Sequence, residues 1–169
     1  TGESEAQVSA RKCFRDLTYL FDLSGEIEPG ALGKPHGGRP SNHTVHDQSA
    51  CPVMFYARFA TTLATDEERR TAFEYLRAHG DFYLNRNWVM NSDGRAHNVV
   101  DPPRTSSMKS MAAVYQAYEA TGDSRYRDAV SGQIQRLVDT GRLPWLKNRF
   151  SVSHNLYYWG LLCDYWTTT

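Results

Sequence analysis

The stretches FATTLATDEERR (residues 59–70) and AYEATGDSRYRD (residues 117–128) resemble each other, and each lies between two segments with helical periodicity. In the first stretch, Thr65 and Glu68 have the spacing of a capping box, which marks the start of a helix. In the second, Gly122 is typical of the residue at which a helix ends. The two stretches therefore predict short turns within helical hairpins, and their similarity indicates an internal repeat.

Apolar residues recur at intervals of three or four residues through most of the chain, whereas the alternation typical of strands is not sustained anywhere. The second predicted helix starts at about Ser49, so that Pro52 falls in its first turn, where proline is tolerated. The sequence predicts an all-α fold of antiparallel helical hairpins, with helices at about residues 3–22, 49–64, 65–82, 105–121, 123–141 and 153–166.

The connections between the predicted helices alternate in length. Residues 24–48, 87–104 and 142–152 are long connections rich in Gly, Pro, Asn and His, whereas the other two connections are short. Antiparallel helices place the long connections at one end. The final stretch CDYWTTT (163–169) stops where another Gly-Asp turn would come. We therefore expect a chain cut within a repeat, whose open edges are covered by a missing segment or a second chain.

Helical hairpins joined by turns such as Ala120–Tyr126, with long loops on one face, resemble the (α/α) toroids of carbohydrate-active enzymes. These include glycoside hydrolases, polysaccharide lyases and sugar epimerases, and the resemblance covers the chain from about Ser49 onward. It implies a single helical-hairpin domain that forms about half of an (α/α)6 toroid, with the second, fourth and sixth helices on the inside. It also implies that an oligo- or polysaccharide binds in a cleft at the long-loop end.

The composition excludes several other classes of protein. The chain has 169 residues, and its 19 Lys and Arg balance its 19 Asp and Glu, so no global field attracts nucleic acid or an anionic membrane. No apolar run has the length of a membrane span, and no targeting segment is recognisable, which leaves secretion and the cytoplasm both open. The sequence contains no phosphate loop, dinucleotide glycine motif or G-x-S-x-G elbow, so we expect no cofactor.

The stretch NHTVHDQSACP (42–52) begins the second predicted helix at the long-loop end. A helix N-terminus offers free N–H groups and favours negative charge, so Asp47 either caps the helix or acts as a catalytic or sugar-binding carboxylate. His43 and His46 are candidate substrate-binding residues. Two histidines without a third ligand do not make a metal site, and we expect none here.

Glycosidic hydrolysis usually needs two carboxyl groups that flank the scissile bond. Glu28 and Asp101 are further acids on the predicted rim, where they act as catalytic groups or remain solvated loop charges. Trp88 is a candidate platform for a sugar ring, because an aromatic face packs well against the C–H face of a pyranose. Arg104 is a further candidate for substrate binding.

The stretch RFSVSHNLYYWGLL (149–162) is the third segment of this rim. Its candidate site residues are Arg149, His154, Asn155, Tyr157 and Tyr158. A lyase acting on a uronic acid needs one group to neutralise the carboxylate and a His or Tyr to remove the neighbouring proton. The stretch resembles the N-H-x-x-W element of toroid uronate lyases, with His154-Asn155 in place of Asn-His. The alternative is that the aromatic residues belong to the core and His154 only starts a helix.

Three functions remain open from the sequence. The favoured one is a glycoside hydrolase that uses rim carboxylates, with Asp47 and His154 both facing the cleft. The second is a polysaccharide lyase that acts through His154 and Tyr157. The third is a helical-repeat binding scaffold without chemistry of its own. His79 and Gly80, in the third predicted helix, are interpreted as structural residues.

Overall fold

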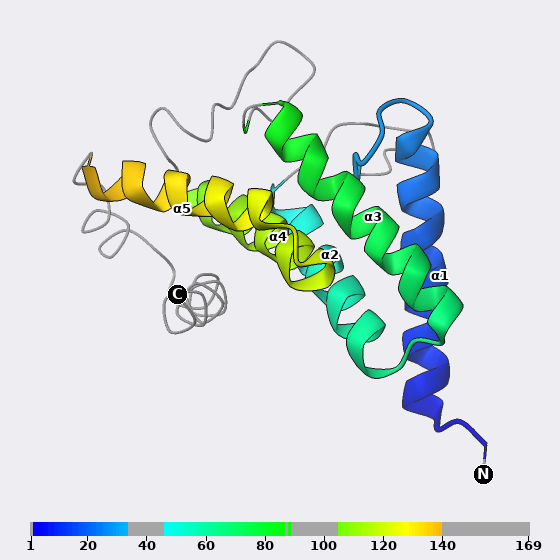
Figure 1. Cartoon of the computed structure of the whole chain (residues 1–169). Coiled ribbons are helices and arrows are strands. Elements are labelled where there is room, and N and C mark those ends of the chain that lie inside the picture. The colour runs from blue at the N-terminus through cyan, green and yellow to red at the C-terminus, as the bar shows by residue number, and fades with distance from the viewer. Residues whose placement is uncertain (1, 34–45, 87, 89–104, 140–169) are drawn as a thin grey trace.

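The computed structural model describes residues 2–33, 46–86, 88 and 105–139, with side chains from Pro52 onward in the second helix, from Ser110 onward in the fourth and at all positions but 137 in the fifth. These residues form five α-helices and no strand (Figure 1). The helices are α1 (Glu5–Gly25), α2 (His46–Thr62), α3 (Asp66–Asn85), α4 (Thr105–Thr121) and α5 (Ser124–Asp139). The all-α prediction is confirmed for this part of the chain. The sixth predicted helix lies outside the described residues.

The predicted start and stop signals act as expected around the short turns. The Thr65 hydroxyl accepts a hydrogen bond from the Glu68 backbone N–H at 3.3 Å, and the Glu68 carboxylate accepts one from the Thr65 N–H at 2.7 Å. The capping box at the start of α3 is therefore confirmed. Gly122 follows α4 with φ of +69°, a conformation that glycine adopts without steric cost.

The start of α2 differs from the prediction. The helix begins at His46 rather than at about Ser49, and Pro52 lies inside it rather than in its first turn. Proline in a helix interior removes one backbone hydrogen bond, so α2 tolerates a local cost at this position. Periodicity could not locate the true start, because residues 46–49 of α2, with the sequence HDQS, are all polar.

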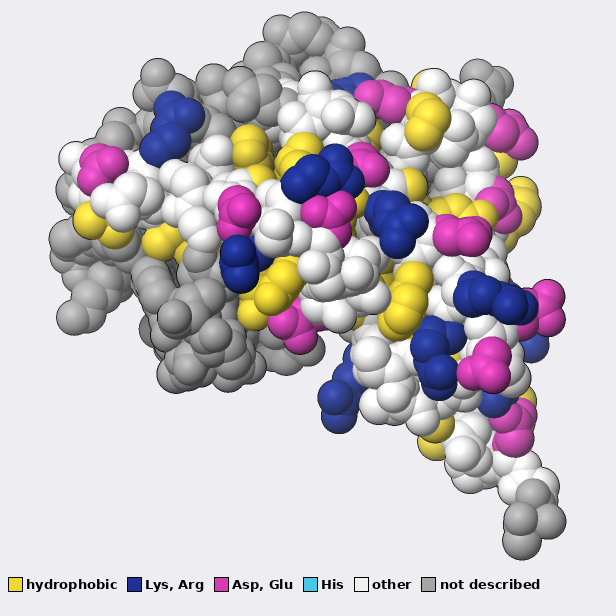
Figure 2. Space-filling model, viewed as in Figure 1, with side chains coloured by type: hydrophobic (Ala, Val, Ile, Leu, Met, Phe, Trp, Pro, Cys, Tyr) yellow, Lys and Arg dark blue, Asp and Glu magenta, His cyan; other side chains and the backbone are white. Residues whose placement is uncertain are grey.

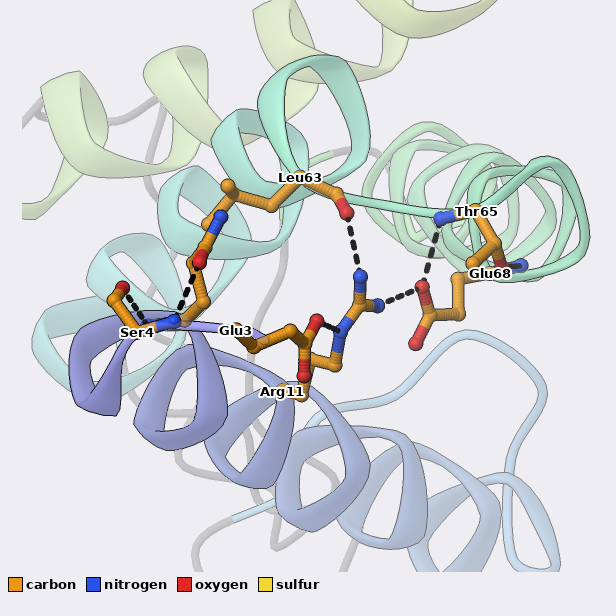
Figure 3. A network of polar contacts seen from close by, with 7 residues as sticks. Glu3, Ser4, Arg11, Leu63, Thr65 and Glu68 are labelled. Carbon is orange, nitrogen blue, oxygen red and sulfur yellow. Dashed lines mark hydrogen bonds and ion pairs between the residues drawn. The ribbon is translucent and has the colours of Figure 1, made fainter. Parts of the chain in front are cut away.

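Contacts along the first three helices fix their directions. Phe14 in α1 stacks on Phe59 near the end of α2, whereas Phe21, two turns later in α1, meets Tyr56, which lies earlier in α2. α1 and α2 are therefore antiparallel. The guanidinium of Arg11 joins the start of α1 to the α2–α3 turn, so α1 and α3 run in the same direction (Figures 1 and 3). The end of α1, the start of α2 and the end of α3 consequently lie at the same end of this layer.

Arg11 makes three polar contacts at the opposite end. It donates to the carboxylates of Glu3 and Glu68 and, at 3.1 Å, to the backbone carbonyl of Leu63 (Figure 3). Glu68 also accepts the Thr65 N–H, so one carboxylate serves both the cap of α3 and the contact with α1. This network fixes the α2–α3 turn against α1.

Among the described residues, α2 and α4 have the largest share of buried positions. α2 contacts α1, α3 and α4, and α4 contacts α2, α3 and α5. Such helices are apolar around most of their circumference. The buried residues of α2 are Val53, Met54, Tyr56, Ala57, Phe59 and Ala60, and those of α4 are Ser110, Met111, Ala112, Ala113, Val114, Tyr115 and Ala117. Within the described part of the chain, α2 and α4 are thus inner helices, and α1, α3 and α5 cover them.

Gly80 allows α3 to approach α4 and α5 closely. A Cβ atom at this position would lie 2.7 Å from a ring carbon of Tyr126 and 2.8 Å from the Cβ of Ala117. The Tyr126 hydroxyl donates to the Asp81 carboxylate at 2.9 Å, so the same contact carries a polar bond at its edge. The interpretation of Gly80 as a structural residue agrees with this packing.

The surface carries both signs of charge. Figure 2 shows basic and acidic side chains interspersed over the viewed face, with single apolar side chains between them. None of the described helices combines the length and the apolar composition of a membrane span.

Candidate functional site

The candidate site lies at the end of the layer where α1 ends and α2 begins. Because α2 starts at His46, Asp47 belongs to its first turn. The N–H groups of a first turn have no partner within the helix, and the helix dipole favours an anion there. The side chains of His46 and Asp47 lie outside the described residues. The structure therefore places the backbone of Asp47 in the first turn of an inner helix.

Residues Glu26–Gly33, here named the strap, continue from α1 and pack against α3. Gly30 lies at the centre of the contact with φ of +78°, and a Cβ there would lie 2.0 Å from the carbonyl oxygen of Ala78. Only glycine fits this position. The backbone N–H of Gly33 donates to the Ser24 hydroxyl at 2.9 Å, which closes the strap onto the end of α1.

Glu28, one of the predicted catalytic acids, belongs to the strap and is half-buried. Both of its carboxylate oxygens accept N–H groups of Arg86, one at 2.6 Å, in a fork-shaped ion pair. The guanidinium of Arg86 also lies 4.7 Å from the centre of the Phe82 ring. The pair attaches the strap to the end of α3.

Trp88, the predicted sugar platform, lies just beyond α3. Its side chain is only 4 % exposed, and its ring centre lies 6.0 Å from that of Tyr83. Its backbone N–H donates to the Tyr83 carbonyl at 2.9 Å, and its φ of 65° is unusual for a bulky residue. Contact with a sugar ring would therefore require this part of the chain to open.

His79 is a buried polar residue whose chemistry the sequence did not indicate. Its Nδ1 lies 2.7 Å from the carbonyl oxygen of Gly30, and its Nε2 has no hydrogen-bond partner among the described residues. The rings of Phe21, Phe82 and Tyr83 surround the imidazole, with centres 5.7, 6.1 and 5.1 Å away. Burial lowers the pKa of His79 to about 4, against a weaker opposing effect of the Gly30 carbonyl. The imidazole is therefore neutral near pH 7.

A signal for this burial was present in the sequence. Ala72, Leu76, His79 and Tyr83 follow one another at intervals of four, three and four residues, which is the spacing of one helical face. All four are buried. A histidine on a buried face needs a polar partner, and the sequence did not show that Gly30 supplies it.

The structure brings together only part of the predicted site. Glu28 and Trp88 lie at the end where α2 begins, together with the backbone of His46 and Asp47. Outside the described residues lie His43, Asp101, Arg104, Arg149, His154, Asn155, Tyr157 and Tyr158. Across the described ranges, no group of three or more His, Cys, Asp or Glu side chains could hold a metal ion.

The chain was compared with protein-family models, curated proteins and solved structures. No family model, no curated protein and no solved structure matches this chain.

Proposed function

We propose that the chain forms part of a carbohydrate-active enzyme of the (α/α) toroid type that hydrolyses glycosidic bonds in an oligo- or polysaccharide. The supporting observation is that α2, an inner helix, begins at His46, so that Asp47 lies in its first turn. Glu28 and Trp88 lie at the same end of the layer. Glycosidic hydrolysis requires carboxyl groups at the cleft, and the first turn of an inner helix is a position that favours a carboxylate.

The surroundings of Asp47 and Glu28 suggest which carboxylate acts as base or nucleophile and which could act as general acid. A helix N-terminus stabilises an anion, which suits Asp47 to act as the base or the nucleophile. Both oxygens of Glu28 are bonded to Arg86, so this residue is not placed to donate a proton. Asp101 is then the candidate general acid, and Glu28 holds the rim in place.

The experiment compares two aspartates that each lie in the first turn of a helix. Asp47 belongs to α2 at the proposed cleft, whereas Asp66 belongs to α3 at the opposite end and has a side chain 93 % exposed. A glycan array on the full-length protein first identifies a ligand, and new reducing ends are then counted. We expect Asp47→Asn to lose about 10²–10⁴-fold in rate and Asp66→Asn to keep full activity.

The same assay separates the alternatives. A product with the ultraviolet absorbance of an unsaturated uronate, lost on His154→Ala rather than on Asp47→Asn, would indicate the lyase. Binding without any cleavage would indicate a scaffold. Full activity of Asp47→Asn would remove Asp47 from the site and leave its stretch as a helix cap.

A further inference from the structure

We propose that the strap is an acid-sensitive segment: protonation of His79 at Nε2 releases residues Glu26–Gly33 from α3 while the inner helices stay packed. The proposal stands on three observations of the described residues. His79 is fully buried, its Nε2 has no partner, and its Nδ1 is bonded to the strap at Gly30. It does not depend on the proposed glycosidase activity.

The neutral imidazole fits this position in one tautomer. Nδ1 carries the hydrogen and donates it to the Gly30 carbonyl, so Nε2 presents a lone pair to an apolar surrounding. A proton taken from solvent onto Nε2 would create a buried cation with a donor that has no acceptor. Burying an unpaired charge is far more costly than burying the neutral ring.

No described carboxylate is placed to neutralise the imidazolium. Among the described side chains, the titratable and charged groups that contact the imidazole, its aromatic neighbours or the strap are Asp22, Tyr56, Tyr75, Tyr83, Glu28 and Arg86. Asp22 accepts the hydroxyl of Tyr75, and Glu28 is paired with Arg86. The Phe82 ring lies parallel to the imidazole and offers only the weak attraction of an aromatic face.

Release of the strap would free Nδ1 of His79 and open one side of the imidazole to water. Besides the backbone bonds by which residues 26–28 continue the end of α1, the strap is held by the His79–Gly30 bond, the Arg86–Glu28 pair and the bond from Gly33 to Ser24. Displacement of the strap breaks the contacts with α3 and exposes the buried Ala31 and Leu32, but keeps the backbone bonds of α3. Local openings of this kind cost less than global unfolding.

Peptide-resolved hydrogen exchange of the intact chain tests the proposal. Protection of the strap amides is compared with that of the α4 core amides between about pH 7 and about pH 4, after correction for the intrinsic exchange rate. The pKa of His79 changes from 6.5 to about 4 on burial, so strap opening should rise by about 100-fold between pH 7 and pH 4. The α4 core amides exchange only on global unfolding, so they should stay more strongly protected than the strap amides at every pH.

His79→Asn is the matched variant, because Asn retains a short donor for Gly30 but does not take up a proton in this range. We expect it to remove the pH dependence of strap opening. Should His79→Asn not fold, an NMR titration of the wild-type imidazole gives the same test. A pKa of His79 near 6.5 with the strap still protected, equal protection of the strap and α4 amides at the same pH, or an unchanged pH dependence in His79→Asn would each overturn the proposal.

Discussion

Gly80→Ala should destabilise the protein, although alanine is the better helix former. In a helix interior, alanine is favoured over glycine by about 1 kcal/mol. Gly80, however, lies where α3 meets α4 and α5. The added methyl group would lie 2.7 Å from the Tyr126 ring and 2.8 Å from the Cβ of Ala117, and both distances are too short for real Cβ contacts.

The expected loss of stability is the difference between two opposing effects, namely the helix preference for alanine and the crowding around its methyl group. Inserting one methyl group into a packed contact typically costs about 1–3 kcal/mol, because side chains or helices must shift. Neither neighbour yields easily, since Tyr126 is fully buried and its hydroxyl is bonded to Asp81, and the Cβ of Ala117 is fixed to the backbone of α4. The overpacking cost should therefore lie in the upper half of this range, about 2–3 kcal/mol, and subtracting the alanine preference of about 1 kcal/mol leaves a net loss of about 1–2 kcal/mol in the free energy of unfolding.

Gly132 in α5 supplies the control. It lies inside a helix as Gly80 does, but a Cβ there would meet no atom within 4 Å. Gly132→Ala should therefore stabilise the protein by up to about 1 kcal/mol. Urea unfolding followed by circular dichroism measures both variants. If Gly80→Ala were as stable as Gly132→Ala, the described packing of α3 against α4 and α5 would be wrong.

Three further predictions concern single contacts. The folded pKa of His79 is about 4 and its unfolded pKa is 6.5, so the unfolded chain binds more protons at pH values between the two. The free energy of unfolding, measured from urea midpoints, should therefore fall by at most about 3 kcal/mol as the pH falls through this range, and His79→Asn should abolish this contribution. Arg11→Met should lower the urea midpoint, because Arg11 joins α1 to the α2–α3 turn, whereas Lys12→Met, which breaks only an exposed pair within α1, should leave it unchanged. Tyr126→Phe should cost about 0.5–1.5 kcal/mol in calorimetry through its hydrogen bond to Asp81, and an unchanged melting temperature would contradict that bond.

Features that depend on neighbouring residues could be predicted from the sequence. The capping box of Thr65 and Glu68 and the glycine that follows α4 are local signals, because their geometry is set within a few residues. The helical class also followed, since periodicity reports which face of a helix is buried. The start of α2 could not be predicted, because its first four residues, 46–49, are polar and carry no apolar periodicity.

Contacts between distant residues could not be predicted. Glu28 and Arg86 are 58 positions apart in the sequence, and Gly30 and His79 are 49 positions apart. The residues around each of them do not indicate which distant residue is its partner. The sequence alone therefore favours Glu28 as an acid on the rim, although its two oxygens are bonded to Arg86. Trp88 likewise read as an exposed platform, whereas its ring packs on Tyr83. In both cases the side chain's contact partner, which the sequence does not reveal, determines whether the side chain is free to bind a substrate.

Cleavage in water labelled with heavy oxygen tests the proposed function most directly. The full-length protein is incubated briefly with an oligosaccharide identified on the glycan array, and the fragments are analysed by mass spectrometry beside uncleaved substrate. Hydrolysis adds one labelled oxygen at the anomeric carbon of each new reducing end, and this label should disappear in Asp47→Asn but not in Asp66→Asn. Cleavage that yields unlabelled, unsaturated fragments, or labelling that persists in Asp47→Asn, would contradict hydrolysis by a carboxylate at the start of α2.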